Sequence, residues 1–355
     1  MLPYLSLILA VRNDRKTVPG LIDRLLEQDY PAELFEIIVV DGRSSDGTAD
    51  LVRRRYSNRH VRVRVVDNPS GRVSASRNAG IRVAAGDAMI FLSGYCTIPS
   101  LKFLADTAEI LEITGAGCLC RPQPLLALNE TRMGDAIARA RASWMGLALN
   151  TEEITGYVDP PSSGATYLRT IFEEVGFFDD SFEECADFEF NERVRKAGIL
   201  AYSDPRLTVY EKPPQELPEL LAERFRFGQG MSRYMRKHPE RASVADIAPL
   251  GVLLALLLTL FAWSQLPTFL AAILTLPAAM FPIAVVLTSM QIGSRYGLRA
   301  GWRAPWVFAA IYLGQGIGLL YEYAFPAGAG SKKHAAPVIT VSPSMEIAGE
   351  ADRVA

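Results

Sequence analysis

The sequence predicts an α/β domain with a mostly parallel sheet, followed by C-terminal transmembrane helices. Strand-like and helix-like segments alternate over the first hundred residues, which is the pattern of a parallel sheet with helices on both faces. The chain has 355 residues, enough for roughly two folded units. Apolar residues make up 49% of the chain and gather in its last third. We therefore expect an α/β domain over residues 1–240, a membrane domain over residues 247–325 and a disordered tail over residues 326–355.

Four short segments carry the β-branched and apolar residues of buried strands, at residues 4–11, 36–41, 61–66 and 88–92. Helices are expected between them at residues 18–26, from residues 46–48 onward and at residues 74–85. The first of these helices has apolar residues at the spacing of one helical face. Because ligands bind where the strands of such a sheet end, polar residues at the strand ends are the first candidates for a site.

The remainder of the α/β domain has a mixed pattern, with helices expected at residues 101–112, 132–149 and within 182–198, and a loop at residues 160–164. Its four cysteines, Cys118 and Cys120 among them, have no zinc-ligand spacing, so we expect buried thiols. The net charge of −2 and the isoelectric point near 6.0 argue against nucleic acid as the main partner.

Three uncharged runs occupy residues 247–263, 266–290 and 305–321. A spanning helix needs roughly 20 apolar residues, so the first and third runs are at the short end and the second is long enough to tilt. Basic residues lie before the first run and between the second and third. The positive-inside rule then predicts a multi-pass protein of the cell inner membrane, with the α/β domain in the cytoplasm and the C-terminus outside. The alternative is a soluble helical domain in which these helices are buried.

Three residues near strand ends and helix starts have side chains that suit a nucleotide diphosphate. Asp41 ends the second strand, where its carboxylate can accept the imide N–H of uracil or, alternatively, stabilise a turn. Arg72 and Arg77 lie around the start of the third helix, and both guanidinium groups and helix N-termini suit phosphates. The alternative for these arginines is a solvated basic face.

Two further candidates lie later in the chain. Asp187 belongs to an acidic stretch and is the candidate general base, because attack on an anomeric carbon requires an acceptor hydroxyl that loses its proton. The alternative is an acidic first turn of a helix, which the helix dipole favours. Arg226 precedes the first apolar run and either binds phosphate or lies at the lipid headgroups.

Four blocks recur in an order that resembles the family 2 glycosyltransferases, which have a nucleotide-sugar-binding fold called GT-A. The blocks cover residues 6–14, 39–48, 76–80 and 176–198, and the resemblance extends over about residues 4–325. A membrane-anchored subgroup that makes succinoglycan and other exopolysaccharides is the most similar. The shared features are Val158-Asp159, Gly164-Ala165, Asp187-x-Glu189-Phe190-Asn191, Arg226-Phe227-Gly228 and the apolar C-terminus.

The resemblance implies an inverting, hexosyltransferase-type enzyme that uses a nucleotide-diphosphate sugar, in the first place a UDP-sugar. Its acceptor would be a glycan or a polyprenyl-linked sugar, and its other partner membrane lipid. The implied roles are as follows: Ala10, Arg12 and Asp41 frame the nucleotide base, Arg77 approaches the donor phosphates or sugar, Asp187 is the base, and Glu189 and Arg226 contact acceptor or phosphate.

The chain departs from the family where a divalent cation is expected. Ser93 and Tyr95 occupy the positions of the metal-binding Asp-x-Asp, and no adjacent residues supply replacement carboxylates. Mg²⁺ or Mn²⁺ is expected from the family, but its ligands are missing, so the sequence makes no cofactor certain. Phosphate stabilisation by Arg72, Arg77 or Arg226 is one solution. The alternatives are a non-catalytic, membrane-tethered binding subunit and a synthase that adds a sugar to a polyprenyl phosphate.

Overall fold

The computed structural model describes residues 1–57, 60–126, 131–146, 154–160, 166–275 and 277–326. The strands are β1 (Leu5–Val11), β2 (Phe35–Asp41), β3 (Arg62–Asp67), β4 (Ala88–Ser93), β5 (Cys118–Cys120), β6 (Gly156–Val158), β7 (Thr166–Leu168) and β8 (Ala201–Ser203). The helices of the α/β domain are α1 (Val18–Leu26), α2 (Thr48–Tyr56), α3 (Val73–Val83), α4 (Phe103–Thr114), α5 (Arg132–Arg141), α6 (Arg169–Val175), α7 (Ala186–Lys196) and α8 (Leu217–Lys237). Four helices follow: α9 (Val244–Gln265), α10 (Thr268–Thr275), α11 (Met280–Tyr296) and α12 (Leu298–Ala324).

The described strands form one sheet in the order β3-β2-β1-β4-β7-β5-β8-β6. Strand β1 pairs in parallel with β2 and β4, and β3 pairs in parallel with β2, as the alternating pattern predicts. The other half of the sheet is mixed, because β7 runs antiparallel to both of its neighbours. Residues Val11, Asp41 and Ser93 therefore end three adjacent parallel strands at the same edge of the sheet.

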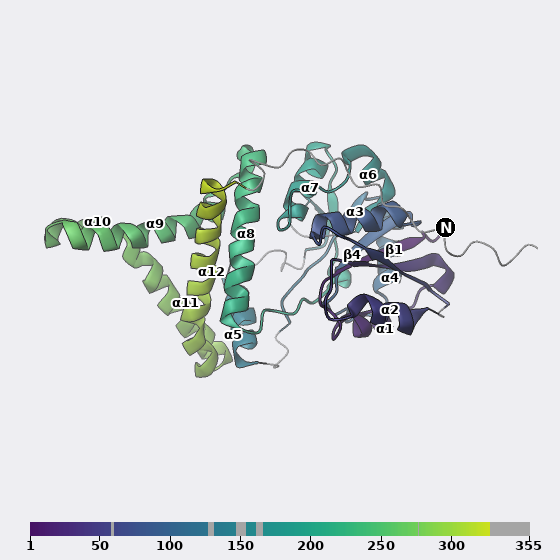
Figure 1. Ribbon diagram of the computed structural model, residues 1–355, viewed down its shortest axis with the longest axis horizontal. Helices are drawn as coiled ribbons and strands as arrows, with labels where there is room; N and C mark the ends of the chain where they lie inside the picture. Colours follow the sequence, from purple (N-terminus) through teal and green to yellow (C-terminus); the bar gives the residue numbers. More distant parts are fainter. Residues whose placement is uncertain (58–59, 127–130, 147–153, 161–165, 276, 327–355) are drawn as a thin grey trace, which may run out of the picture.

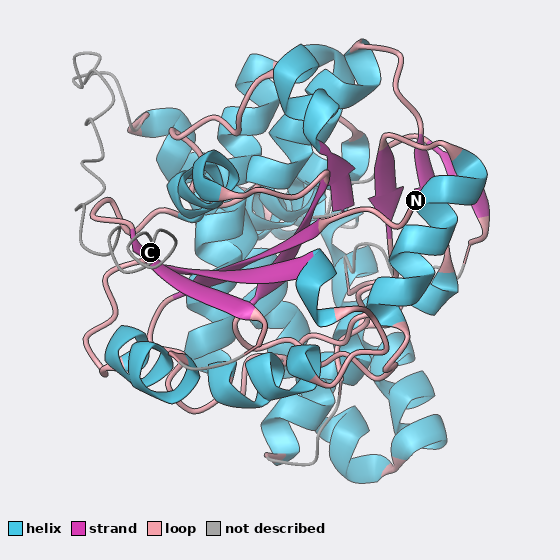
Figure 2. Ribbon diagram, turned by 90° about the vertical axis from the view of Figure 1, so that its right-hand side faces the viewer, coloured by secondary structure: helices cyan, strands magenta, loops and turns pink. Residues whose placement is uncertain are grey.

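Helices cover both faces of the sheet, which runs through the middle of the domain in Figure 2. On one face, alternate residues of β1 pack with α1, α2 and α4 around Leu7 and Phe103. On the other face, α3, α6 and α7 pack around Ile8 and Phe190. The continuous apolar sequence of β1 and β2 is explained by this burial on both faces. All four cysteines are unpaired and buried, as expected.

The C-terminal helices differ from the three predicted spans. The run at residues 266–290 is divided into α10, a short 3-10 turn at Pro277–Ala279, and α11. Proline has no N–H to continue a helical hydrogen-bond ladder, which agrees with a break there. Within the described residues, two helices are long and apolar enough to cross a membrane, α9 and α12. The predicted tail lies outside the described residues, apart from Pro326.

Helix α9 is almost entirely exposed, whereas α12 is mostly buried inside the protein. Figure 1 shows α12 upright beside α8, while α9 and α10 extend away from the α/β domain. The carboxylate of Glu322 on α12 is fully buried and pairs with Arg233 and Arg236 of α8, at 2.9 and 2.8 Å. Helix α8 thus covers one side of α12, and most of the apolar stretch of α12 is buried within the protein.

The two helices approach closely because glycines lie at their contact. A Cβ atom built on Gly318 of α12 would lie 2.1 Å from the carbonyl oxygen of Phe225. One built on Gly228 of α8 would lie 2.3 Å from the carbonyl oxygen of Gln315. Both distances are far below van der Waals contact, so any side chain at either position pushes the backbones apart.

We expect Gly318→Ala to destabilise the protein by about 1–3 kcal/mol, because the added methyl group meets the backbone of α8. Thermal unfolding of the full chain in detergent measures the loss. The matched control is Gly251→Ala on the exposed helix α9, where an added Cβ meets nothing within 4 Å. Equal melting temperatures for Gly318→Ala and the wild type would contradict the close helix contact.

Candidate active site

A cleft of about 950 Å³ lies at the ends of β1 and β4. Its opposite wall comes from the segment that begins α7 and from α8. Seven of the residues predicted for the site line this cleft: Ala10, Arg12, Arg77, Ser93, Tyr95, Asp187 and Arg226. Residues that are far apart in the sequence thus line the same cleft, and Ala10 and Arg226 are separated by more than 200 residues.

Asp41 ends β2 as predicted, and its side chain is buried beside this edge of the sheet rather than in the lining of the cleft. Its Oδ2 accepts a hydrogen bond from the backbone N–H of Ser44 at 3.0 Å. Its Oδ1 is buried and has no hydrogen-bond partner among the described residues. A buried acceptor without a partner is costly, so this oxygen suits an N–H donor of a bound ligand. The predicted contact with a nucleobase remains a prediction.

Asp187 and Arg77 form a two-point ion pair inside the cleft. Nη2 of Arg77 donates to Oδ2 of Asp187 at 2.9 Å, and Nη1 donates to Oδ1. The guanidinium also lies over the ring of Phe178, at 5.1 Å. Arg77 thus orients the candidate base, and its predicted approach to the donor phosphates or sugar remains a prediction. A carboxylate has about four lone-pair sites, so the pair leaves acceptor capacity for a hydroxyl group.

Glu211 is a carboxylate at the metal-motif position that sequence reasoning missed. Its Oε1 lies 3.5 Å from Oγ of Ser93, although the two residues are 118 positions apart. Backbone hydrogen bonds between Tyr210 and Thr97 bring the segment there. Burial raises the pKa of Glu211, and the nearby carboxylates of Glu223 and Asp187 raise it further, against the lowering effect of the surrounding arginines. No pattern around Glu211 in the sequence marks it, because a tertiary contact alone places it.

Three arginines that were not predicted also line the cleft: Arg121 and Arg224, which are buried, and Arg141, which is partly buried. The Nε atom of each has no hydrogen-bond partner in the part of the chain that the structure describes. Arg141 and Arg224 share one carboxylate, that of Glu223, at 3.1 and 2.5 Å. Burial lowers the pKa of Arg141 to about 10, and the neighbouring guanidinium of Arg224 acts in the same direction.

The remaining predicted arginines are placed less centrally. Arg72 does not line the cleft, and its Nη1 donates to the backbone oxygen of Asp180 at 3.1 Å. Arg226 lines the cleft with a half-exposed side chain, and its Nε lies 3.5 Å from Oε1 of Glu184. Of the three arginines expected to replace a metal, none is both inside the cleft and free of a carboxylate partner among the described residues.

Comparison with known proteins identifies the kind of domain that contains this cleft. Residues 6–175 match the family model for glycosyl transferase family 2. The chain carries a family 2 glycosyltransferase domain. Succinoglycan biosynthesis protein ExoA of Rhizobium meliloti is 23% identical over 248 residues, which are 69% of this chain and 74% of that protein. Glycosyltransferase AglE of Haloferax volcanii is 25% identical over 233 residues, 64% of this chain and 73% of that one.

The fold of the glycosyltransferase domain is also found in solved structures. Mannosyltransferase PcManGT from Pyrobaculum calidifontis, in complex with GDP-Man and Mn²⁺, superposes with a TM-score of 0.61 at 18% identity. The match covers 91% of this chain and 88% of that one. This likeness shows the GT-A fold, and the family model supports a glycosyltransferase role for the domain in glycan biosynthesis.

The residues of this glycosyltransferase domain do not fit a divalent cation at the family's position. Ser93 and Tyr95 offer neutral oxygen atoms, and Glu211 is a single carboxylate whose pKa burial raises. Across the described ranges, one group of three metal-ligating side chains comes within 4.8 Å of one another, and it consists of Glu192, His238 and Glu240, outside the cleft. Hard cations such as Mg²⁺ require several oxygen ligands, usually including carboxylates.

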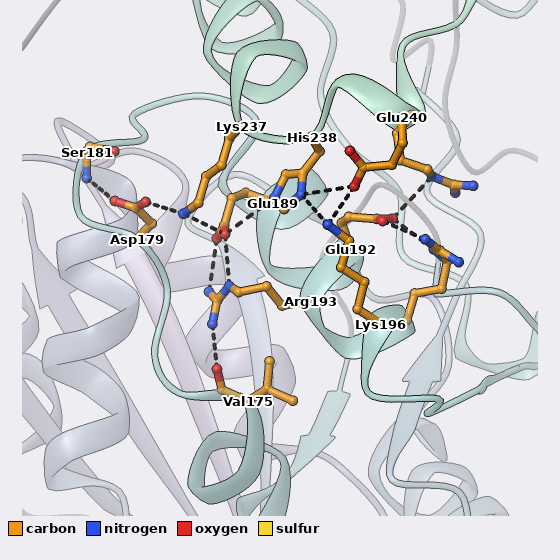
Figure 3. Close-up of polar contacts among 12 residues, drawn as sticks. Val175, Asp179, Ser181, Glu189, Glu192, Arg193, Lys196, Lys237, His238 and Glu240 are labelled. Atoms are coloured by element: carbon orange, nitrogen blue, oxygen red, sulfur yellow. Dashed lines mark hydrogen bonds and ion pairs between the residues drawn. The ribbon is translucent and has the colours of Figure 1, made fainter.

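The group of Glu192, His238 and Glu240 is part of an ion-pair network between α7 and the end of α8 (Figure 3). Glu192 pairs with Arg195 at 2.6 Å and also with Arg241, while Glu240 pairs with a lysine at 2.5 Å. Cations of the protein therefore already neutralise these carboxylates. These ion pairs connect α7 to the end of α8, and their carboxylates are not available as metal ligands.

Glu189 belongs to the same network, which corrects its predicted position in the site. Its carboxylate is fully buried and pairs with Arg193 and Lys237, both at 2.8 Å (Figure 3). It does not line the cleft. Glu189 lies one helical turn or less from Asp187, but on a different face of α7, so closeness in sequence does not bring it to the acceptor or phosphate.

We expect Glu211→Gln to raise the melting temperature relative to the wild type more at pH 8 than at pH 5. A raised pKa in the folded state means that the folded protein holds this proton at pH values where the unfolded chain has lost it. The stability that the wild type gains from this bound proton is fully present below the pKa of Glu211 in the unfolded chain, and it is lost as the pH rises through the pKa in the folded protein. Glutamine has no proton to lose, so its advantage over glutamate grows with pH. Thermal unfolding across this pH range measures the difference, and a difference that shrinks with pH contradicts the raised pKa.

Proposed function

We propose that this chain is an inverting hexosyltransferase that moves a sugar from a nucleotide-diphosphate sugar, in the first place a UDP-sugar, to a glycan or lipid-linked acceptor. The observation that carries the proposal is Asp187, held by Arg77 in a cleft at the carboxyl ends of β1 and β4. The relative ExoA is a succinoglycan biosynthesis protein, which supports a role in the assembly of an exopolysaccharide. The GDP-Man complex of PcManGT supports a sugar nucleotide as donor.

In the proposed reaction, Asp187 accepts the proton of an acceptor hydroxyl as its oxygen attacks the anomeric carbon of the donor. The bond from that carbon to the diphosphate breaks at the same time, and the nucleoside diphosphate leaves with the bonding electrons. Attack from the face opposite the leaving group inverts the anomeric configuration. Arg77 keeps the carboxylate of Asp187 oriented, while Oδ1 of Asp41 accepts an N–H of the nucleobase.

We further propose that α9 attaches the protein to the cell inner membrane, with the glycosyltransferase domain in the cytoplasm. Helix α9 has 22 residues and a mean hydropathy of 2.3, and its apolar side chains are exposed. Basic residues lie on both sides of the apolar segment, at Arg233–Arg241 and Arg295–Arg303, which favours a cytoplasmic position for those ends. This position brings the cleft close to lipid-linked acceptors.

A second candidate is a membrane-tethered subunit that binds nucleotide sugar or glycan without catalysis. The neutral pair of Ser93 and Tyr95 favours it, because the family's cation stabilises the departing diphosphate by several kcal/mol. Purified protein that binds a sugar nucleotide but transfers no sugar to water, glycan or lipid-linked acceptor would support this candidate over the first.

We expect Asp187→Asn to lower kcat for sugar transfer by about 10²- to 10⁴-fold, because the amide cannot accept the hydroxyl proton. The KM for the sugar nucleotide should change little. Release of UDP or GDP from a panel of sugar nucleotides in membrane extracts with native acceptors measures the rate. The matched control is Glu174→Gln, an exposed acidic residue of α6 outside the cleft, which should keep the wild-type rate. An unchanged kcat in Asp187→Asn overturns the assignment of the base.

A further inference from the structure

We propose that Arg121 and Arg141 bind the donor diphosphate directly and replace the divalent cation that related enzymes use. The inference rests on the proposed use of a nucleotide-diphosphate donor and specifies how this cleft holds it. Neither arginine belongs to the four sequence blocks that resemble the family, at residues 6–14, 39–48, 76–80 and 176–198. Both arginines line the cleft that also contains Ser93 and Tyr95, the positions that lack metal ligands.

Arg121 follows β5 and lies beside the end of β4. Its side chain is almost fully buried, with 4% of the residue exposed, and Nη2 donates to the backbone oxygen of Phe91 at 2.7 Å. Phe91 precedes Ser93 by two residues, so this bond fixes the guanidinium near the former metal position. Nε has no hydrogen-bond partner, and no carboxylate comes within 4 Å of the group, among the residues that the structure describes. Burial lowers the pKa of Arg121.

Arg141 ends α5 and lines the same cleft. It shares the carboxylate of Glu223 with Arg224, so one negative charge faces two guanidinium groups. Electrostatic interaction with both Arg121 and Arg141 acts on Glu211, which lies 3.5 Å from Ser93. Both proposed arginines thus line the same cleft as Glu211 and are close enough to it to act on its charge.

A diphosphate fits this cleft better than a cation does. Guanidinium groups with unfilled N–H donors inside a protein are unfavourable, and two oxygens of a phosphate group can accept two parallel N–H bonds from one arginine. A divalent cation would instead be repelled by both groups. In related enzymes, the bound ion neutralises the carboxylates of the Asp-x-Asp motif. Without an ion, carboxylates at these positions would repel the donor phosphates, and Ser93 and Tyr95 avoid that repulsion. The neutral side chains of Ser93 and Tyr95 and the guanidinium groups of Arg121 and Arg141 thus belong to one arrangement, in which fixed positive charge takes the place of a metal ion.

The test is a calorimetric titration of the full chain in detergent with inorganic pyrophosphate, UDP and GDP, first in EDTA and then with Mn²⁺. We expect pyrophosphate and at least one nucleotide to bind in EDTA, with little change on adding Mn²⁺. Arg121→Gln and Arg141→Gln should each weaken binding by about tenfold or more, since a hydrogen bond to a charged group is lost. The matched control is Arg139→Gln on the same helix, which pairs with Asp135 and lies outside the cleft.

Two further variants keep the test decisive if Arg121→Gln does not fold. Arg121→Lys keeps the positive charge and should therefore bind pyrophosphate more tightly than Arg121→Gln. If Arg121→Gln does not fold, Arg141→Gln serves as the comparison, and Arg121→Lys should bind pyrophosphate at least as tightly as that variant. Ser93→Asp leaves both arginines in place but adds a carboxylate, and it should weaken binding in EDTA by about tenfold. Equal binding by Ser93→Asp and the wild type in EDTA would contradict the inference.

Binding that requires Mn²⁺ overturns the inference, as does the absence of binding by all three probes. The proposed function fails separately. Metal-dependent binding together with sugar transfer that requires Asp187 keeps the transferase and removes only the arginine site. Metal-free binding that depends on the arginines, in a protein whose transfer rate is unchanged by Asp187→Asn, keeps the diphosphate site and removes the proposed base.

Discussion

Helix α8 packs closely against the backbone of α12 and against the backbone of the segment before α7. The wall of the cleft that α8 helps to form depends on these two contacts. Gly228 faces α12, where a Cβ atom would meet the carbonyl oxygen of Gln315 at 2.3 Å. Gly230, two residues later, faces the segment before α7, where a Cβ atom would meet the carbonyl oxygen of Glu184 at 2.7 Å. Because both contacts are close, α8 cannot shift toward either neighbour. The cleft residues of α8 are thereby held opposite the end of β4.

The charges of the cleft are balanced without an added ion. Its lining contains eight acidic and eight basic side chains, so the total formal charge is zero. Three of the carboxylates form ion pairs with arginines of the cleft: Asp187 with Arg77, Glu223 with Arg141 and Arg224, and Glu184 with Arg226. A local excess of positive charge arises at Glu223, where one carboxylate faces the guanidinium groups of Arg141 and Arg224. Electrostatic stabilisation of a departing diphosphate requires such a fixed positive charge, whether a metal or the protein supplies it.

The apolar C-terminus shows how composition differs from environment. Helices α9 and α12 both have the length and composition of a membrane span. In the folded protein α12 packs along α8 and buries Glu322 in ion pairs, whereas the apolar side chains of α9 face outward. Hydropathy reports how favourable it is to remove a segment from water, and both lipid and a protein core satisfy that preference. The neighbours of the helix decide between the two.

The sequence by itself determined the parallel half of the sheet and the strand ends, because apolar periodicity is a local property that burial on two faces imposes. It also identified Asp187 and Arg77 through short blocks whose order resembles a family, and the structure brings these two side chains together. It misplaced Glu189, because two residues of one helix can face different surroundings. It gave no sign of Arg121, Arg141 or Glu211, since isolated charged residues have no local pattern. Tertiary structure alone decided their positions, because packing between segments distant in the chain sets which charges become buried together.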